Sequence, residues 1–323
     1  MRFWLSHGCD GFRVDMAGSL VKQDPEGKGT AEVWRYIFSD LKKQFPGMAC
    51  VAEWCDPPKA INLAGFDMDF YLHRPGNGIS SLLRLFDETG KDKSFFSQNG
   101  NGSITTFLQE YLPWYEATKD KGYICFPTGN HDTSRLTKHL TTNEMKLAFA
   151  FLFTMPGIPF LYYGDEIGMK YLTLISKEGG YERTGSRSPM QWNHLKSNLG
   201  FSDAESKQLY LPVDSGPFAP CVDIEEQDSS SLLNMVRKIL RLRHQIKDLG
   251  SKANLEILYA KDKEFPFVYR RGKYILAVNP SSKVVQIAFP FNCSPSLFSI
   301  NEATVGENVL SMSPQSFAIF PTI

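Results

Sequence analysis

The sequence predicts an α/β fold made of parallel βα units, followed by a smaller antiparallel β region. Between residues 10 and 163, short apolar segments of strand length alternate with longer segments of helical periodicity. From Leu255 onwards, only short alternating segments separated by turn residues remain. We therefore expect two domains, the first over residues 1–250 and the second, an all-β sandwich, over residues 251–323.

The first four predicted elements are a helix over 1–7, a strand over 10–15, a helix over 31–45 and a strand over 48–52. Gly8 suits the left-handed position that closes a helix, and Pro46 with Gly47 ends the second helix. That helix is amphipathic, because one face is expected to carry Val33, Trp34, Ile37, Phe38 and Leu41. The two strands end at Asp15 and Glu53.

The alternation continues with a strand over 68–72, helices over 80–88 and 107–117, a strand over 123–127, a helix over 144–155 and a strand over 158–163. Pro156 and Gly157 stop the apolar helix before the last strand. A polar loop is expected over 97–103, and an irregular stretch runs from about 170 to 227. An amphipathic helix over 230–249 then precedes antiparallel strands over 267–270, 274–278 and 284–287.

The composition points to a globular protein that binds neither nucleic acid nor a membrane. Lys and Arg together number 35, as do Asp and Glu, so no net field draws the chain to nucleic acid or to an anionic membrane. The sequence shows no secretory signal and no apolar run of roughly 18 residues, and it gives no compartment. The six cysteines form no Cys-x-x-Cys unit, so we expect no zinc or redox site.

Three acidic residues, Asp15, Glu53 and Asp132, each follow the end of a predicted strand. The carboxyl ends of parallel strands in a βα barrel converge on one face, where such folds place their chemistry. Asp15 and Glu53 are 38 residues apart, which fits one βα unit and makes their strands neighbours. Two carboxyl groups about 5 Å apart are the arrangement that a retaining glycosidase requires.

Arg13 is predicted to give these two carboxyl groups different environments. It precedes Asp15 by two residues on the same strand and so faces the same side, where a guanidinium favours the ionised form of Asp15. Glu53 lies between the apolar Ala52 and Trp54, where partial desolvation favours the protonated form. A structural ion pair at a strand end explains Arg13 and Asp15 equally well, and spacing alone does not decide between the two.

Five segments, in this order, resemble the α-amylase superfamily, glycoside hydrolase family 13. The segments are Gly8-Cys9-Asp10-Gly11-Phe12-Arg13-Val14-Asp15, Val51-Ala52-Glu53-Trp54, Gly129-Asn130-His131-Asp132, Gly157-Ile158-Pro159 with the residues 162–169, and Arg187-Ser188-Pro189-Met190-Gln191-Trp192-Asn193. The last segment is similar to one found in the α-glucosidase, oligo-1,6-glucosidase and trehalose synthase branches. Together the five segments extend from residue 8 to residue 193.

The resemblance implies roles for the residues that match. Asp15 would be the nucleophile, Glu53 the acid/base and Asp132 the third catalytic carboxylate, which holds sugar hydroxyls. Arg13 and His131 would bind substrate. Taken alone, His131 is more readily explained as a hydrogen-bonded loop histidine, and it is the motif that favours substrate contact. The implied substrate is an α-glucan or maltooligosaccharide. We predict no metal ligand and no certain cofactor in this chain, while the family's calcium is possible in a full-length protein.

The resemblance also implies an incomplete barrel. Asp15 matches the end of the family's fourth strand, so the chain would supply strands four to eight of a (β/α)8 barrel, which needs about 250 residues in full. We therefore expect a C-terminal portion of a longer enzyme, with exposed strand edges and low stability. A soluble, cooperative thermal transition of residues 1–323 alone would count against low stability.

Several readings of the function remain open from the sequence. A glycosidase of the α-amylase or α-glucosidase type, a transglycosylase or isomerase of the same family, a non-catalytic binding relative and an inactive fragment all fit. Comparing free reducing sugar with transfer products separates the first two. Trp54 and Trp192 are each as compatible with stacking on sugars as with packing, and Asp165 and Glu166 are expected to be structural.

Overall fold

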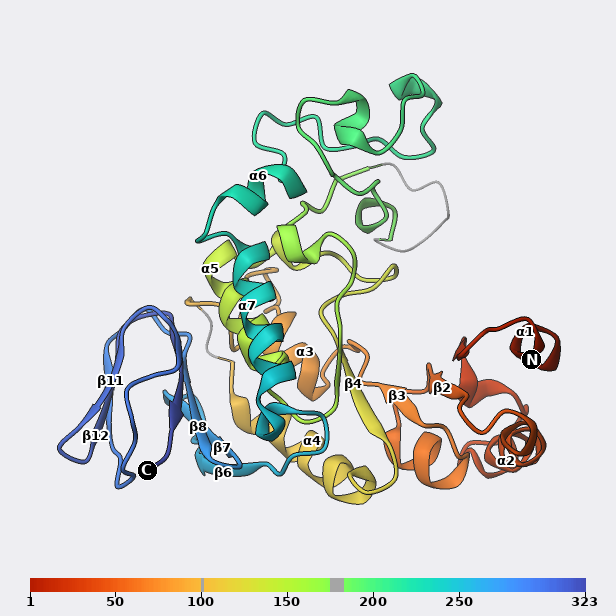
Figure 1. Ribbon diagram of the computed structural model, residues 1–323, viewed down its shortest axis with the longest axis horizontal. Coiled ribbons are helices and arrows are strands. Elements are labelled where there is room, and N and C mark those ends of the chain that lie inside the picture. The colour runs from red at the N-terminus through yellow and green to blue at the C-terminus, as the bar shows by residue number, and fades with distance from the viewer. Residues whose placement is uncertain (100–101, 175–182) are drawn as a thin grey trace.

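The computed structural model describes residues 1–99, 102–174 and 183–323. Within these ranges the chain forms one parallel sheet of five strands and two antiparallel sheets of five and three strands. The first βα units and the antiparallel sheets lie at opposite ends of the molecule, with a group of helices between them (Figure 1). No helix in the described ranges is both long and apolar enough to cross a membrane.

The parallel sheet has its strands in chain order: β1 Gly11–Val14, β2 Ala49–Ala52, β3 Met68–Phe70, β4 Tyr123–Pro127 and β5 Ile158–Phe160. Every neighbouring pair is parallel, so all the carboxyl ends lie along one edge of the sheet. The predicted α/β alternation is therefore observed. β1 and β5 form the two outer strands, and among the described residues neither pairs with a further strand.

The helices are α1 Arg2–Ser6, α2 Lys28–Gln44, α3 Gly78–Leu83, α4 Ile104–Thr118, α5 Thr142–Leu152, α6 Val222–Gln227 and α7 Leu232–Gln245. Most of the longer ones begin at a side chain that accepts a backbone N–H, as Ser103, Thr141 and Ser231 do. At α5 the cap is a reciprocal capping box, because the side chain of Glu144 also accepts the N–H of Thr141.

Two details of the predicted helices are wrong. The helix expected over 80–88 ends at Leu83, because Arg84 turns inward and donates to the carbonyl oxygens of Thr128 and Ser134. On α2, Val33 is 38% exposed rather than part of the buried face. The predicted polar loop over 97–103 and the predicted irregular stretch over 170–227 each contain residues outside the described ranges, namely 100–101 and 175–182. The described part of 170–227 consists mainly of loops and short helical turns.

The C-terminal strands are β6 Glu256–Tyr259, β7 Phe267–Arg271, β8 Tyr274–Asn279, β9 Val285–Ala288, β10 Phe298–Ile300, β11 Ala303–Gly306, β12 Val309–Met312 and β13 Ser316–Pro321. They form one sheet in the order β10-β13-β8-β7-β6 and a second in the order β11-β12-β9. Buried residues of both sheets, such as Ile275 and Leu310, belong to one apolar cluster, so the two sheets pack face to face.

The other face of the larger antiparallel sheet packs on the helices. A single apolar cluster joins residues of α4, α5 and α7 to residues of β7, β8 and β13. Within it the ring of Phe151 on α5 meets the ring of Tyr269 on β7 edge to face, with 6.0 Å between centroids. The hydroxyl groups of Thr154 and Tyr269 are 2.6 Å apart, so a polar contact also joins the two regions.

A buried arginine on α7 ties this junction together. Arg243 donates to the carbonyl oxygens of Phe153 and Met155, both at 2.9 Å, and also to the carbonyl oxygen of Gly157. It reaches the hydroxyl of Ser251 as well, at 3.1 Å. These carbonyl groups lie between the end of α5 and the start of β5, where no helix or strand hydrogen bond can satisfy them. Burial lowers the pKa of Arg243 to about 10, so its side chain stays charged at neutral pH.

We predict that Arg243→Met lowers the free energy of unfolding by roughly 3 kcal/mol, because several buried carbonyl groups lose their donor. The matched control is Arg241→Met, on the exposed face of the same helix, which should change stability by less than about 0.5 kcal/mol. Urea unfolding followed by circular dichroism measures both. Equal stability of the two variants would contradict the assigned role of Arg243.

Candidate active site

The register of β1 and β2 places two carboxylates side by side. Val14 is paired with Ala52, so the residues that follow, Asp15 and Glu53, leave the two strands at the same level. The N–H of Glu53 donates to the carbonyl oxygen of Val14 at 3.0 Å, which extends the pairing by one residue. Asp15 and Glu53 therefore stand next to each other at the carboxyl edge of the sheet.

Arg13 bridges the two carboxylates. Its Nη1 forms an ion pair with Oδ1 of Asp15, and its Nη2 lies 2.8 Å from Oε2 of Glu53. The same Oε2 accepts the backbone N–H of Met16 at 3.0 Å, which fixes the rotamer of Glu53. The side chain of Asp15 is 72% exposed, whereas that of Glu53 is only 20% exposed. The two acids thus differ in their access to solvent.

The surroundings of Asp15 favour its ionised form. The pKa of Asp15 is lowered below its ordinary value, and the Arg13 guanidinium is the largest cause. A hydrogen bond with the carboxyl of Glu53 lowers this pKa further, and His131 makes a smaller contribution.

A cavity of about 160 Å³ opens beside this pair. Its polar lining includes Arg13, Glu53 and His131, which come from the ends of β1, β2 and β4. Phe70 of β3 and Phe160 of β5 supply apolar lining, and their rings meet edge to face with 4.7 Å between centroids. All five parallel strands or the loops directly after them thus contribute to one concave site of mixed polarity.

Asp132 lies next to this cavity but does not line it. Its Oδ2 is 3.3 Å from Nε2 of His131, and its Oδ1 is 3.1 Å from Nη2 of Arg187 and 3.5 Å from Nε of Arg183. Asp132 instead lines a neighbouring cavity of about 700 Å³ that also contains His73 and Arg84. Arg13, Glu53 and His131 thus share the lining of the smaller cavity, whereas Asp15 and Asp132 do not line it. Asp15 is linked to the lining by its ion pair with Arg13, and Asp132 by its contact with His131.

Arg183 and Arg187 are site neighbours that reasoning from the sequence did not select. From the sequence, Arg187 is identified only as the first residue of a segment that resembles the family. Both arginines lie on a loop more than 50 residues beyond Asp132, and no periodic pattern links them to it. The sequence does contain one signal, because two basic residues four positions apart flank an otherwise uncharged stretch. This pattern does not indicate which acidic residue the two arginines contact.

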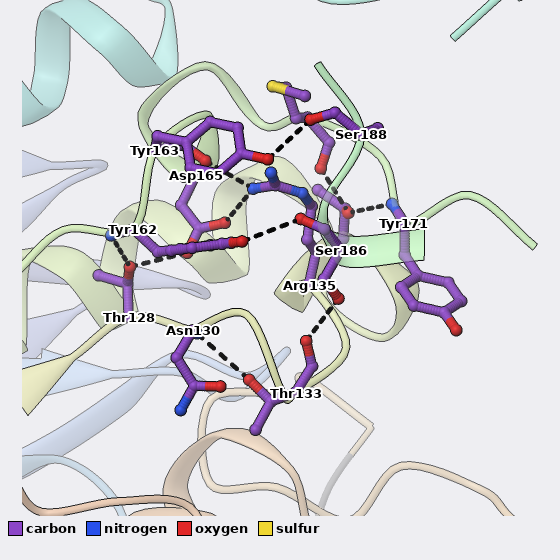
Figure 2. Close-up of polar contacts among 12 residues, drawn as sticks. Thr128, Asn130, Thr133, Arg135, Tyr162, Tyr163, Asp165, Tyr171, Ser186 and Ser188 are labelled. Carbon is purple, nitrogen blue, oxygen red and sulfur yellow. Dashed lines mark hydrogen bonds and ion pairs between the residues drawn. The ribbon is translucent and has the colours of Figure 1, made fainter. Parts of the chain in front are cut away.

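A buried network holds the β4 loop against the β5 loop (Figure 2). Arg135 and Asp165 form an ion pair of 2.9 Å with side chains only 1% and 3% exposed. The hydroxyl of Thr128, at the end of β4, donates to Asp165 at 2.7 Å. The guanidinium of Arg135 also lies 5.0 Å from the ring centroids of both Tyr162 and Tyr163. These contacts hold the residues on either side of Asn130-His131-Asp132 in place.

The loop after Glu53 depends on Asp69 of β3. The carboxylate of this fully buried residue accepts the N–H groups of Trp54, Cys55 and Asp56 at 3.0, 3.2 and 2.8 Å. Burial raises the pKa of Asp69 to about 7 in spite of these donors. Trp54 is itself only 9% exposed and packs on Gly18, where a β-carbon would lie 2.6 Å from its ring. Trp54 therefore packs on Gly18, and it also lines a cavity together with Glu53.

Within the described residues, no group of three or more His, Cys, Asp or Glu side chains could hold a metal ion. The acidic pair Asp165 and Glu166 is no exception, because Asp165 is already bound to Arg135 and Thr128. The described site residues offer two unlike carboxyl groups, a bridging guanidinium and an imidazole.

Comparisons with known proteins agree on one family. Residues 85–251 match the family described as "Alpha amylase, catalytic domain"; the match includes Asp132 but not Asp15 or Glu53. The mouse protein "Amino acid transporter heavy chain SLC3A1" is 31% identical over 292 residues, which cover 83% of this chain and 41% of that protein. "Trehalose synthase/amylase TreS" of Mycobacterium tuberculosis is 28% identical over 287 residues, 76% of this chain and 45% of its own length.

A crystal structure of the trehalulose synthase MutB from Pseudomonas mesoacidophila MX-45 has a similar fold. Its TM-score is 0.79 at 17% sequence identity, over 100% of this chain and 67% of that one. At this identity the likeness concerns the fold alone. The chain spans less than half the length of the two curated relatives named above.

We predict that Arg13→Gln raises the pKa of Asp15 towards its ordinary value, because the strongest stabiliser of the carboxylate is removed. Because the pKa of Asp15 is lower in the folded chain than in the unfolded chain, the ionised form of Asp15 stabilises the fold. This stabilisation is present at neutral pH and is lost as the pH falls through the lowered pKa. Titration of the carboxyl carbon by NMR measures the shift. The control is Arg2→Gln, whose partner is the distant Asp40; an unchanged Asp15 titration in Arg13→Gln would refute the bridge.

Proposed function

This chain belongs to the α-amylase catalytic-domain family, and from that premise we propose that it acts as a retaining glycoside hydrolase on α-glucosidic bonds of starch-like glucans or maltooligosaccharides. The observation that carries the proposal is the single guanidinium of Arg13 in contact with both Asp15 and Glu53. One exposed, ionised carboxylate beside one more buried carboxyl group is the pairing that retention of configuration requires.

In the proposed reaction, an oxygen of Asp15 attacks the anomeric carbon of the bound glucosyl unit. The bond to the leaving oxygen breaks as Glu53 transfers its proton to that oxygen, which leaves a covalent glycosyl ester on Asp15. Glu53, now a carboxylate, removes a proton from a water molecule that attacks the same carbon. The ester bond breaks, Asp15 returns as a carboxylate and Glu53 is again protonated.

The remaining predicted residues are assigned to substrate. Arg13 orients Asp15 through their ion pair, and His131 lines the same cavity with its side chain 48% exposed. We assign Asp132 to holding sugar hydroxyl groups, in a position fixed by Arg183 and Arg187. Binding that strengthens as the ring flattens towards the oxocarbenium-like transition state would lower the barrier.

For the fold, we propose that β1 to β5 are strands four to eight of a (β/α)8 barrel, within a catalytic domain over 1–250 that precedes an all-β domain over 251–323. The strictly sequential parallel order supports this proposal, as does the likeness to a chain of which this one covers 67%. The two outer strands, β1 and β5, then mark where the remaining strands of the barrel would pair.

Two other functions have a specific observation in their favour. A transglycosylase or isomerase would use the same carboxylates with a sugar hydroxyl in place of water, and the relative named trehalose synthase/amylase supports it. A non-catalytic role is supported by the relative named as an amino acid transporter heavy chain. The joint contact of Arg13 with Asp15 and Glu53 favours catalysis, because a purely structural protein has no need of an exposed carboxylate at that position.

We predict that Asp15→Asn and Glu53→Gln each lower the hydrolysis of maltotriose by at least about 10³-fold, because each removes a group that forms or breaks a bond. The matched control, Asp262→Asn in an exposed turn, should retain activity. A fluorinated glucosyl fluoride that reacts slowly should leave a covalent adduct on the peptide that contains Asp15. A folded wild-type chain that neither hydrolyses maltotriose nor forms the adduct would sink the proposal.

A further inference from the structure

Asp69 of β3 is a buried carboxylate that takes no part in the proposed reaction. Its side chain is 0% exposed. Phe70, the next residue of the strand, lines the cavity that contains Glu53 and His131. Because successive side chains of a strand point to opposite faces of the sheet, Asp69 points away from that cavity and does not touch a substrate bound there. A carboxylate is costly to bury, so its presence requires another explanation.

The partners of Asp69 are the three backbone N–H groups that directly follow Glu53. Oδ1 accepts the N–H groups of Trp54 and Cys55 at 3.0 and 3.2 Å, and Oδ2 accepts the N–H of Asp56 at 2.8 Å. Hydrogen bonds to an ionised carboxylate are stronger than those between neutral groups. Three consecutive N–H groups directed at one carboxylate therefore determine the path of this loop.

The loop needs this support because one of its residues has an unfavourable backbone conformation. Cys55 has φ of +60°, in the left-handed region that a residue with a β-carbon rarely adopts. Its N–H is one of the three that Asp69 accepts. Arg74 adds a further contact, since its Nη2 donates to the carbonyl oxygen of Trp54 at 2.9 Å. Without Asp69, we expect the loop to relax towards an ordinary conformation.

Glu53 directly precedes this loop, so the placement of its side chain depends on the loop. The N–H of Glu53 donates to the carbonyl oxygen of Val14 at 3.0 Å, and its carbonyl oxygen accepts the N–H of Ala17 at 3.1 Å. The direction in which the chain leaves Glu53 is then set by Trp54, whose N–H is bound by Asp69. A displacement of about 1 Å in a reacting group can lower a rate about 10²-fold.

We propose that Asp69 is a positioning residue, whose carboxylate holds the backbone after Glu53 so that the carboxyl group of Glu53 reaches the leaving oxygen. This inference rests on the proposed function, in which Glu53 is the acid/base. Glu53 gives a proton to the leaving oxygen and later removes one from water, so both steps depend on its placement. Binding of the substrate does not, and loss of Asp69 should therefore lower kcat and leave KM nearly unchanged.

Asp69→Asn tests the proposal, because the amide keeps the shape of the side chain but directs its own N–H groups at backbone N–H groups. We expect kcat for maltotriose to fall about 10²-fold. The matched control is Asp67→Asn, at the start of the same strand. Asp67 accepts the N–H of Cys50 at 2.8 Å, within β2 and away from the loop, so its loss should leave kcat unchanged. Wild-type kcat in a folded Asp69→Asn variant refutes the proposal.

Glucosyl fluoride with azide separates a displaced acid/base from a general loss of structure. Fluoride leaves as an anion without a proton from Glu53, while Asp15 forms its bond to the anomeric carbon. Azide then attacks that carbon without a general base, which yields glucosyl azide and frees Asp15. Asp69→Asn should therefore convert these reagents nearly as fast as the wild type does. An equal loss of activity on maltotriose and on the fluoride would mean that Asp69 supports only the fold.

The titratable groups beside Asp69 are two thiols and one carboxyl group. Burial raises the pKa of the Cys55 thiol to about 11 and that of Cys125, on β4, well above its ordinary value, so both thiols stay protonated at neutral pH. The carboxylate of Asp56 forms an ion pair of 3.1 Å with Lys59. Asp69 itself differs from these groups, because burial raises its pKa to about 7.

A pH profile of the wild type therefore provides a check without a substitution. As the pH falls through about 7, Asp69 gains a proton and can accept fewer N–H groups. Asp15 remains ionised, because its pKa lies below the ordinary value. The kcat for maltotriose should decline between about pH 8 and about pH 6 in the wild type and be nearly flat there in Asp69→Asn. The same decline in both proteins, or in neither, would contradict the role of Asp69.

Amide hydrogen exchange separates a failure of this inference from a failure of the proposed function. Exchange of the amides of residues 54–56 should be faster in Asp69→Asn than in the wild type, and unchanged in Asp67→Asn. Faster exchange together with a wild type that does not hydrolyse maltotriose would support the hold of Asp69 on the loop and contradict the proposed function. Hydrolysis by the wild type with unchanged exchange in Asp69→Asn would refute the role of Asp69 alone.

Discussion

The parallel pairing of β1 with β2 is the constraint on which the site depends. Because Val14 is opposite Ala52, the next residues of both strands leave the sheet together, and the backbone hydrogen bond from Glu53 to Val14 keeps them at one level. Arg13 can then reach both carboxyl groups at once. A slip of one residue would turn Asp15 and Arg13 to the opposite face of the sheet from Glu53, so the chemistry of the pair follows directly from strand register.

The surrounding elements keep that edge of the sheet rigid. Asp69 holds the loop after Glu53 through three backbone N–H groups, and the Arg135–Asp165 ion pair fastens the loops after β4 and β5. Further away, Arg243 ties the helices to the start of β5. In each case a buried charged group binds backbone or an opposite charge, which is the condition under which such a group is tolerated in a core. Preorganised loops of this kind are what a site needs in order to act on substrate without rearranging.

Reasoning from the sequence located the parallel strands and most helices, because apolar periodicity and stop residues are local signals. The strand over 123–127 coincides with β4, while the end of α3 was missed because the inward turn of Arg84 is decided by partners at Thr128 and Ser134. For the site, the neighbourhood of Asp15 and Glu53 follows from one βα unit. The contacts of Asp132 with Arg183 and Arg187 could not be predicted in this way, because they join the end of a strand to a loop whose path no local sequence pattern describes.

The stereochemistry of the first product tests the central claim most directly. If Asp15 and Glu53 act as nucleophile and acid/base, two successive displacements at the anomeric carbon restore its configuration. Proton NMR during the first minutes of maltotriose hydrolysis by this chain should therefore show the α-anomer of the released sugar before mutarotation produces the β-anomer. Initial release of the β-anomer would show a single displacement by water and would contradict a covalent role for Asp15.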